Sequence, residues 1–178
     1  MNNEYKKATG VIRAGGIVVI PTDTIYGVVG DALNKETVER IYRLKGRPPE
    51  KPFIILISNL NQLNRFGAKL SEELNKYWPG PVSIILEIKS NLEYLHRETN
   101  ALAFRMPDKP ELLKLIEETG PIVAPSANIS AMEPAKNINE AKNYFGEAVD
   151  YYIDEGDLNR KPSALIKIVD DKVKYLRK

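Results

Sequence analysis

Ile17-Val18-Val19-Ile20 is an uninterrupted run of β-branched residues, with Gly15-Gly16 before it and Pro21 after it. Such a run is typical of a strand that is buried on both faces, because a strand with one wet face alternates apolar and polar residues. The stretch therefore predicts a central strand of an α/β fold. Working back from it, the spacing of apolar residues predicts a helix over Asn3–Arg13 that the two glycines end.

The rest of the chain alternates helical and strand patterns in the same way. Asn34 is expected to cap a helix, Pro110 to open another and residues 139–145 to form a third, with short helical turns at 60–66 and 71–77. Apolar runs predict strands at 53–57, 82–88, 102–104, 122–123, 151–153, 165–169 and 173–176. The polar residues 90–100 predict a surface excursion. This pattern indicates a single α/β domain over residues 1–178, without repeats or linkers.

Composition excludes several classes of protein. With 26 Lys and Arg against 24 Asp and Glu, the net charge of +2 does not by itself argue for nucleic acid. The absence of cysteine excludes disulfides, thiolate zinc sites and cysteine nucleophiles. The one histidine, His96, cannot build a His-rich metal site, and we expect it at the surface. Residues 1–7 carry charge and no apolar run, so we expect a soluble, cytoplasmic protein that does not bind a membrane.

A basic loop, Lys45-Gly46-Arg47-Pro48-Pro49-Glu50-Lys51-Pro52, lies between a predicted helix and a predicted strand. Arg47 offers a planar fork for phosphate or carboxylate, and Lys45 and Lys51 add point charges. We expect Lys45 and Arg47 to be exposed in the loop. Two interpretations remain open for the loop taken alone, an anion-binding site and a solvated turn.

Three further stretches place polar groups at the ends of predicted strands. Thr22-Asp23-Thr24-Ile25-Tyr26-Gly27 offers hydroxyls and a carboxylate, Arg105 ends another strand, and Ala124-Pro125-Ser126-Ala127-Asn128 offers a hydroxyl and an amide. Each also has an ordinary structural interpretation as a turn or a solvated strand end. Trp78, before Pro79-Gly80-Pro81, is expected to pack against the core.

The common nucleotide and hydrolase motifs are missing. The sequence contains neither G-x-x-x-x-G-K-[ST] nor a G-x-G-x-x-G that follows a strand, and one histidine in a polar stretch does not suit a hydrolase triad. What remains is a set of cations, hydroxyls and an amide at strand ends. Such groups position a phosphorylated ligand and neutralise developing charge while the bound substrates react with each other.

The five motifs together resemble the YrdC family of threonylcarbamoyl-AMP synthases. They are the stretch from Pro21 to Gly27, Lys45-Gly46-Arg47-Pro48 with Lys51-Pro52, Trp78-Pro79-Gly80-Pro81, Arg105-Met106-Pro107 and the stretch from Ala124 to Asn128. Their order and spacing match over nearly the whole chain, which resembles the short form of the family. The resemblance implies a twisted mixed sheet with helices packed around it and a positively charged concave pocket.

The resemblance also implies a reaction. L-threonine takes up CO2 or hydrogencarbonate, and the carbamate attacks the α-phosphate of ATP to give threonylcarbamoyl-AMP and pyrophosphate. Mg2+ is expected with the ATP, because displacement of pyrophosphate calls for cations around the phosphates. The product would supply a separate transferase complex that forms threonylcarbamoyladenosine in tRNA.

Site residues follow from the resemblance by position. Thr24, Arg105, Ala124 and Ser163 would bind threonine, and Lys45, Arg47 and Lys51 the triphosphate. Ser126 and Asn128 would lie near the α-phosphate, and Arg177 would bind the nucleotide. Lys45, Arg47, Ser126 and Asn128 would carry the catalysis, and no protein-bound metal is expected. The placement of Ser163 and Arg177 rests on spacing alone.

Four positions depart from the family pattern. Leu56 stands where many members have histidine, and Ala101 where threonine is common. Ala131 stands where glycine usually follows the Ser-Ala-Asn segment, and Ala164 where threonine normally follows the serine at position 163. These departures leave open a divergent paralogue with a different acceptor. A non-catalytic protein that binds tRNA or other RNA is the main alternative, and its binding would weaken steeply with salt. A carbamoyl-adenylate former of hydrogenase maturation is the second, although the short chain without cysteine-rich zinc segments speaks against it.

Overall fold

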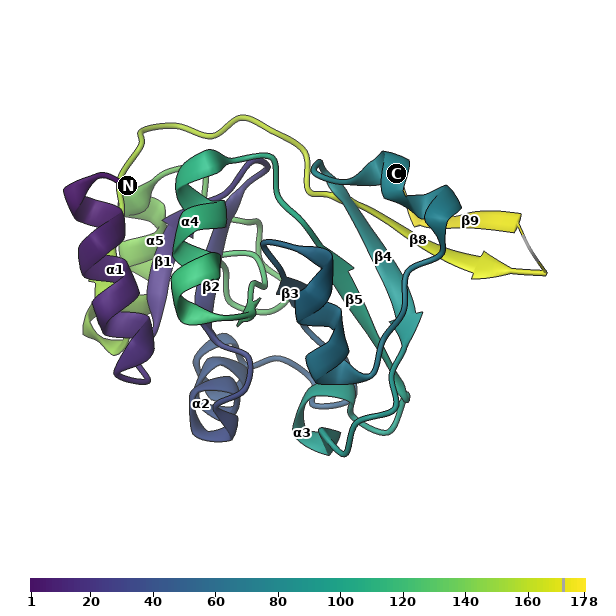
Figure 1. Cartoon of the computed structure of the whole chain (residues 1–178). Coiled ribbons are helices and arrows are strands. Elements are labelled where there is room, and N and C mark those ends of the chain that lie inside the picture. Colours follow the sequence, from purple (N-terminus) through teal and green to yellow (C-terminus); the bar gives the residue numbers. More distant parts are fainter. Residues whose placement is uncertain (171) are drawn as a thin grey trace.

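The computed structural model describes residues 1–170 and 172–178 and contains a mixed sheet with helices around it (Figure 1). The α-helices are α1 (Asn3–Arg13), α2 (Lys35–Lys45), α3 (Glu93–His96), α4 (Pro110–Thr119) and α5 (Ile138–Phe145). The 3-10 helices are η1 (Leu60–Phe66), η2 (Glu72–Tyr77) and η3 (Gly146–Ala148). The strands are β1 (Val18–Pro21), β2 (Tyr26–Asp31), β3 (Ile54–Leu56), β4 (Val82–Glu87), β5 (Ala101–Arg105), β6 (Ile122–Val123), β7 (Tyr151–Tyr152), β8 (Ala164–Val169) and β9 (Lys172–Arg177).

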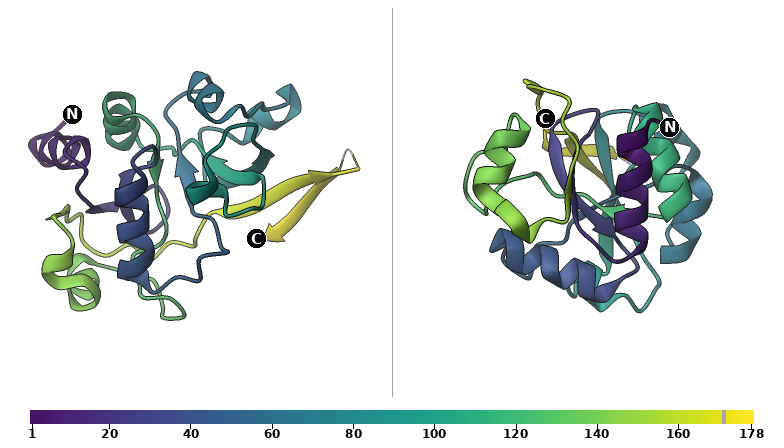
Figure 2. Two further views of the ribbon diagram at one scale, coloured as in Figure 1. Left: turned by 90° about the horizontal axis from the view of Figure 1, so that it is seen from below. Right: turned by 90° about the vertical axis from the view of Figure 1, so that its left-hand side faces the viewer.

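The sheet of the described residues runs in the order β7-β1-β2-β6-β3-β5-β4-β8-β9. β1 pairs with β7, β3 with β5 and β4 with β8 in parallel, and the other neighbouring pairs are antiparallel. This confirms the prediction of a twisted mixed sheet in an α/β fold. Figure 1 and the left view of Figure 2 show that the β8–β9 hairpin extends away from the rest of the molecule.

The β1 strand is buried on both faces, as its sequence predicts. Val18 and Ile20 join a cluster with residues of α1 and α4, whereas Ile17 and Val19 join a larger cluster with residues of α2 and α5. Successive side chains of a strand point to opposite faces, so this run is apolar throughout because both faces are covered. Figure 2 shows α1 and α4 side by side.

Most of the predicted elements are present, and one strand was missed. The helix at Asn3–Arg13 and the cap at Asn34, whose Oδ1 accepts a hydrogen bond from the Thr37 amide, are confirmed. The missed strand is β2, which contains Gly27 and Gly30 and does not read as a strand pattern. A Cβ on Gly30 would lie 2.4 Å from Cγ2 of Thr37, so glycine here lets α2 pack closely on the sheet.

The segment from Ser90 to Asn100 was predicted as a surface excursion, and this was wrong in part. It contains α3, whose Leu95 is buried in the larger cluster. His96, expected at the surface, is only 5% exposed. The two apolar residues Leu92 and Leu95 are spaced to reach the core from a short helix, a signal that the polar composition hides. Trp78 packs against the larger cluster, as predicted, and its indole nitrogen donates to the carbonyl of Val82.

Candidate active site

A cavity of about 200 Å³ lies where the ends of several strands and loops meet. It is lined from the β1–β2 turn, the loop after α2, the end of β5, the loop after β6 and the last strand. Among the residues predicted for the site, those that line it are Thr24, Arg47, Arg105, Ala124, Ser126, Ser163 and Arg177. The fold therefore brings together polar groups that lie up to 153 positions apart in the sequence, from Thr24 to Arg177.

The β1–β2 turn is ordered by its own hydroxyls. The Thr22 hydroxyl donates to the Ile25 carbonyl at 2.8 Å and accepts from the Thr24 amide at 3.1 Å. The hydroxyl oxygens of Thr22 and Thr24 lie 3.0 Å apart, and both residues are buried. Such local bonds between side chain and backbone fix the turn, so the Thr24 hydroxyl is held at the cavity wall before any ligand arrives.

Arg105 is a buried cation with a buried counter-ion. Its Nη1 pairs with Oδ1 of Asp23, and the other Asp23 oxygen accepts from the Asp108 amide at 3.1 Å. Burial lowers the pKa of Arg105, and the Asp23 charge opposes this shift. The Arg105 Nε is buried and has no hydrogen-bond partner among the described residues. A guanidinium held on one side by Asp23 is suited to receive a ligand carboxylate on another.

Asp23 is the functional residue that sequence reasoning missed. It lies inside the quoted turn motif, but only Thr24 was assigned a role there. The carbonyl of Asp23 also accepts from Arg160 at 2.9 Å, so the segment before β8 is tied to the same turn. The signal was the carboxylate itself, because a carboxylate between two buried threonines needs a cationic partner.

Lys45 does not lie in an exposed loop, and that prediction was wrong. It is the last residue of α2 and is 2% exposed. Its Nζ donates to the carbonyls of Ser126 at 2.5 Å and Asn128 at 2.6 Å, and to Oδ1 of Asn128 at 3.2 Å. Burial, with a smaller contribution from the Arg47 charge, lowers the pKa of Lys45 to about 7. Lys45 therefore links the Ser126–Asn128 loop to the end of α2 by hydrogen bonds.

The Ser126–Asn128 loop carries the polar groups that were predicted to lie near the α-phosphate. The Ser126 hydroxyl donates to Oδ1 of Asn128 at 2.6 Å, and Nδ2 of Asn128 donates to the Met132 carbonyl at 2.6 Å. Ser126 lines the cavity, whereas Asn128 and Lys45 are buried behind it. Of the four residues predicted to carry catalysis, Arg47 and Ser126 thus line the cavity, whereas Lys45 and Asn128 support its wall.

Arg47 is half-buried and held by neutral groups. Its Nε donates to the Lys51 carbonyl at 2.9 Å and its Nη2 to the Pro52 carbonyl at 3.3 Å. No carboxylate of the described residues lies within salt-bridge distance of it, and burial lowers its pKa. A cation without a counter-ion at the wall of a cavity favours an anionic ligand.

Ser163 and Arg177, predicted from spacing alone, lie next to each other. Arg177 donates from Nε to the Ser163 carbonyl at 2.9 Å and from Nη2 to the Ser163 hydroxyl at 3.2 Å, and this hydroxyl lies 2.9 Å from that of Ser83. Burial first, and then the charges of Arg105 and Arg47, lower the pKa of Arg177. Arg177 therefore lies in the positive field of Arg105 and Arg47, and a site of this kind favours an anionic ligand.

A second cavity of about 360 Å³ adjoins the first and shares Arg47, Pro52, Ile54 and Arg177 with it. Its floor is apolar and is formed by residues that alternate along the strands with core residues: Ile54, Ile85, Ala101, Ala103 and Leu165. Lys51 stands at this cavity rather than at the first. Together the two cavities offer a polar compartment and an apolar one with arginines between them.

A family model described as "Telomere recombination", Sua5_yciO_yrdC, matches residues 10–178. The chain belongs to the Sua5/YciO/YrdC family. The family resemblance predicted from the five motifs is thereby confirmed.

Individual members of the Sua5/YciO/YrdC family resemble the chain over most of its length. It is 34% identical to a threonylcarbamoyl-AMP synthase of Marinobacter nauticus, over 91% of this chain and 90% of that protein. It is 37% identical to a threonylcarbamoyl-AMP synthase of Pyrococcus abyssi over 84% of this chain, but spans only 46% of that longer protein. A crystal structure of P. abyssi Sua5 complexed with L-threonine superposes with a TM-score of 0.89 at 33% identity, covering 97% of this chain and 53% of that one.

Two of the four departures from the pattern of the Sua5/YciO/YrdC family have a structural context. Ala131 adopts a φ of 68°, in the left-handed region that glycine adopts without strain, so the alanine costs about 1 kcal/mol there. Ala101 lies on the floor of the apolar cavity. Leu56 is fully buried in the cluster with α4, and the amide of Ala164 donates to the Pro81 carbonyl. Leu56 and Ala164 are not among the residues that line the 200 Å³ cavity.

Two negative findings concern the described residues. In ranges 1–170 and 172–178, no group of three or more His, Cys, Asp and Glu side chains could hold a metal ion. Within those same ranges, no helix has the length and apolar character needed to span a membrane.

Proposed function

We propose that this protein is an L-threonylcarbamoyladenylate synthase, using L-threonine, CO2 or hydrogencarbonate, and ATP. The observation that carries the proposal is the convergence of Arg47, Arg105 and Arg177 on one polar cavity that opens to an apolar one. Family membership, and the relatives named as threonylcarbamoyl-AMP synthases, support it. The superposed P. abyssi protein with bound L-threonine supports threonine as the amino acid.

Each substrate has a compartment that suits its chemistry. The threonine carboxylate is proposed to bind Arg105, beside the hydroxyls of Thr24 and Ser163 and the Ala124 backbone. The phosphates are proposed to bind Arg47, together with Arg177 and Lys51 of the adjoining 360 Å³ cavity. The adenine base is proposed to lie on the apolar floor of that second cavity. Ser126 faces the reacting centre, while Lys45 and Asn128 hold its loop in place.

The reaction needs no enzyme nucleophile. The threonine amine adds to the carbon of CO2 and loses a proton, which forms the carbamate. A carbamate oxygen then attacks the α-phosphorus, and the bond from this phosphorus to the pyrophosphate oxygen breaks. The arginines stabilise the charge that grows on the phosphates, and the ordered hydroxyls position the carbamate in line with the leaving group.

Mg2+ is proposed to enter as part of the ATP complex. The residues that line the 200 Å³ cavity include arginines and hydroxyls but no carboxylate, and the adjoining cavity has one carboxylate, that of Glu50. So few carboxylates fit a Mg2+ held mainly by phosphate oxygens and water. When bound, the ion neutralises phosphate charge during displacement of pyrophosphate.

We also propose where the product goes. An acyl-adenylate is an activated donor, so a separate transferase is expected to consume it and modify tRNA. We propose that the protein acts in the cytoplasm, where ATP, threonine and tRNA are all available. Direct contact of this chain with RNA is the alternative, and it is distinguished by a steep loss of binding as salt is raised.

The function is tested by measuring pyrophosphate release from ATP with each substrate left out in turn. We expect release that requires both threonine and hydrogencarbonate, and a product with the mass of threonylcarbamoyl-AMP. Arg47→Ala should lose at least about a hundredfold in turnover, since removal of a preorganised charge costs this much in comparable sites. Release that requires carbamoyl phosphate in place of threonine and hydrogencarbonate would instead favour a carbamoyl-adenylate former. A protein that binds RNA but releases no pyrophosphate would favour the non-catalytic alternative.

A further inference from the structure

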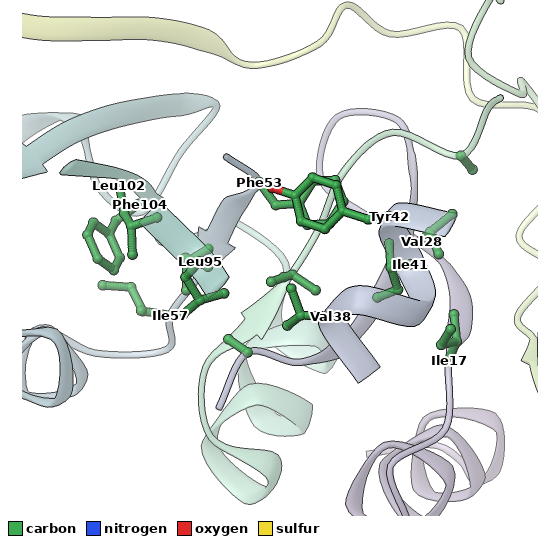
Figure 3. Close-up of a cluster of buried hydrophobic side chains, with 14 of the residues drawn as sticks. Ile17, Val28, Val38, Ile41, Tyr42, Phe53, Ile57, Leu95, Leu102 and Phe104 are labelled. Atoms are coloured by element: carbon green, nitrogen blue, oxygen red, sulfur yellow. The ribbon is translucent and has the colours of Figure 1, made fainter. Parts of the chain in front are cut away.

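Arg47 stands at one end of a column of four side chains. The Cζ atom of Arg97 lies 4.1 Å from the centre of the Tyr42 ring, and the Tyr42 and Phe53 rings stack with their centres 4.0 Å apart at an angle of 24°. The Cζ atom of Arg47 lies 5.4 Å from the Phe53 centre. Figure 3 shows the two rings lying over each other beside α2. Two cations thus flank a pair of aromatic rings.

The column is also tied to the basic loop by one backbone carbonyl. The Lys51 carbonyl accepts from the Tyr42 hydroxyl at 3.0 Å and from Nε of Arg47 at 2.9 Å. The Tyr42 hydroxyl therefore fixes the acceptor that orients Arg47, and Cζ of Arg47 lies over the Phe53 ring. Of the residues that orient Arg47, Pro52 and Phe53 line the 200 Å³ cavity, whereas Tyr42 and Lys51 do not.

Arg97, at the other end, is held in an unusual conformation. It follows α3 with φ 49° and ψ 50°, in the left-handed region that non-glycine residues rarely adopt. Its Nη2 pairs with Oε1 of Glu39 at 2.8 Å, and its Nε is buried with no hydrogen-bond partner among the described residues. Residues that end a helix often adopt this conformation, and Glu98 and Asn100 also have positive φ, so the contacts with Glu39 and Tyr42 are what distinguish Arg97.

We propose that Arg97 and Tyr42 are positioning residues for Arg47. Arg97 packs on the Tyr42 ring. Tyr42 in turn stacks on Phe53 and donates to the Lys51 carbonyl, and both of these groups contact Arg47. The identity of the ligand, a nucleoside triphosphate, rests on the proposed function, whereas the column itself is a property of the free protein. Arg97 would then influence phosphate binding from outside both cavities.

A double-mutant cycle tests this with ATP and L-threonine as separate probes. Arg97→Met should weaken ATP binding about tenfold, the scale of a desolvated cation–π contact, and leave threonine affinity without ATP within about twofold. Arg97→Lys, which keeps the cation, should restore part of the loss. In an Arg47→Gln background, Arg97→Met should cost no further ATP affinity, because the residue it positions is already gone. Equal loss in both backgrounds, or equal loss for threonine, would overturn the proposal in favour of a purely structural role.

Arg40→Met is the matched control. Arg40 lies on the same helix and pairs with Asp150 at 2.8 Å, but it is not part of the column. The control should leave ATP affinity within about twofold, as expected for loss of an exposed ion pair. A loss comparable to that of Arg97→Met would show that any ion pair on α2 matters, which contradicts a specific column.

A measurement without ligand separates failure of the column from failure of the proposed function. The Nε proton of Arg47 can be followed by NMR in the free protein, with that of Arg177 as an internal reference. Arg97→Met and Tyr42→Phe should shift the Arg47 signal and speed its exchange with water, while the Arg177 signal stays in place. An unchanged Arg47 signal in both variants would refute the column even if ATP binds. A changed signal in a protein that binds no ATP would uphold the column and refute the proposed function.

Discussion

Two cations are buried beside the cavity, Lys45 and Arg105, and they have different kinds of partner. Arg105, 4% exposed, has the carboxylate of Asp23 as its partner. Lys45, 2% exposed, has three oxygens of the Ser126–Asn128 loop, and none of them carries a formal charge. A buried cation without a counter-ion is costly, and it lowers its pKa in response.

The difference separates two jobs within one site. The charge of Arg105 is balanced, so Asp23 sets its position, and we propose that its free Nε binds a ligand carboxylate. Lys45 has no counter-ion, and its hydrogen bonds hold in shape the loop that we propose to face the phosphates. The predictions below test this division, from the largest expected effect to the smallest.

The first prediction breaks the balanced pair. Asp23→Ala leaves Arg105 buried without a counter-ion, and we expect the free energy of unfolding to fall by about 3–5 kcal/mol. Urea denaturation measures it. Glu118→Gln, which removes the exposed partner of Arg13, is the control and should cost less than about 1 kcal/mol. Equal costs for the two variants would mean that Arg105 does not depend on Asp23.

The second prediction removes the unbalanced cation. Lys45→Met leaves three oxygens without their donor, at a cost of about 1–3 kcal/mol that loss of the buried charge partly offsets. The protein should therefore fold, while pyrophosphate release falls about a hundredfold because the Ser126 loop is misplaced. Lys35→Met, an exposed lysine at the start of α2, is the control for activity. Near-normal turnover of Lys45→Met would contradict a role for Lys45.

The third prediction concerns pH. The pKa of Lys45 is lowered from 10.5 to about 7 in the folded chain, so between these values the unfolded chain binds the proton more tightly. Stability contributed by this group is therefore lowest below pH 7 and rises with pH, by about 1 kcal/mol from pH 7.5 to 8.5. The difference in unfolding free energy between the wild type and Lys45→Met shows this rise. If the unfolding free energies of the wild type and Lys45→Met change with pH in parallel, Lys45 stays charged in this range and its three oxygen partners are enough to stabilise the charge.

The smallest effect is expected within the loop itself. Ser126→Ala removes the hydrogen bond to Oδ1 of Asn128 and should lower stability by about 0.5–1.5 kcal/mol. Ser130→Ala, in the same loop, changes a hydroxyl with no side-chain hydrogen bond among the described residues. Thermal unfolding compares the two. A larger cost for Ser130→Ala would contradict the importance of the Ser126–Asn128 contact.

The sequence was informative wherever local patterns decide the outcome. The β-branched run at β1, the cap at Asn34 and the proline at the start of α4 each act through nearby residues, so their elements were predicted close to their observed bounds. The same holds for the chemical content of the site. Thr24, Arg105 and Ser126 were predicted to lie at strand ends, and these strand ends meet at one cavity.

What could not be predicted depends on contacts between distant segments. The burial of Lys45 follows from a loop 81 positions further along the chain, and nothing near Lys45 signals it. β2 was missed because it contains Gly30, which allows the close packing of α2 and which a strand pattern does not show. His96 is buried because α3 turns a polar segment back onto the core. In each case the deciding partner is remote in sequence.

The central claim is that one polar cavity binds an amino acid through Arg105 and cooperates with a nucleotide bound at Arg47. Calorimetric titration with L-threonine, with and without a non-hydrolysable ATP analogue and Mg2+, tests it most directly. The account predicts one threonine per chain, bound more tightly when the analogue is present, and loss of this binding in Arg105→Gln. Threonine affinity that is the same with and without the analogue, or that survives Arg105→Gln, would contradict it.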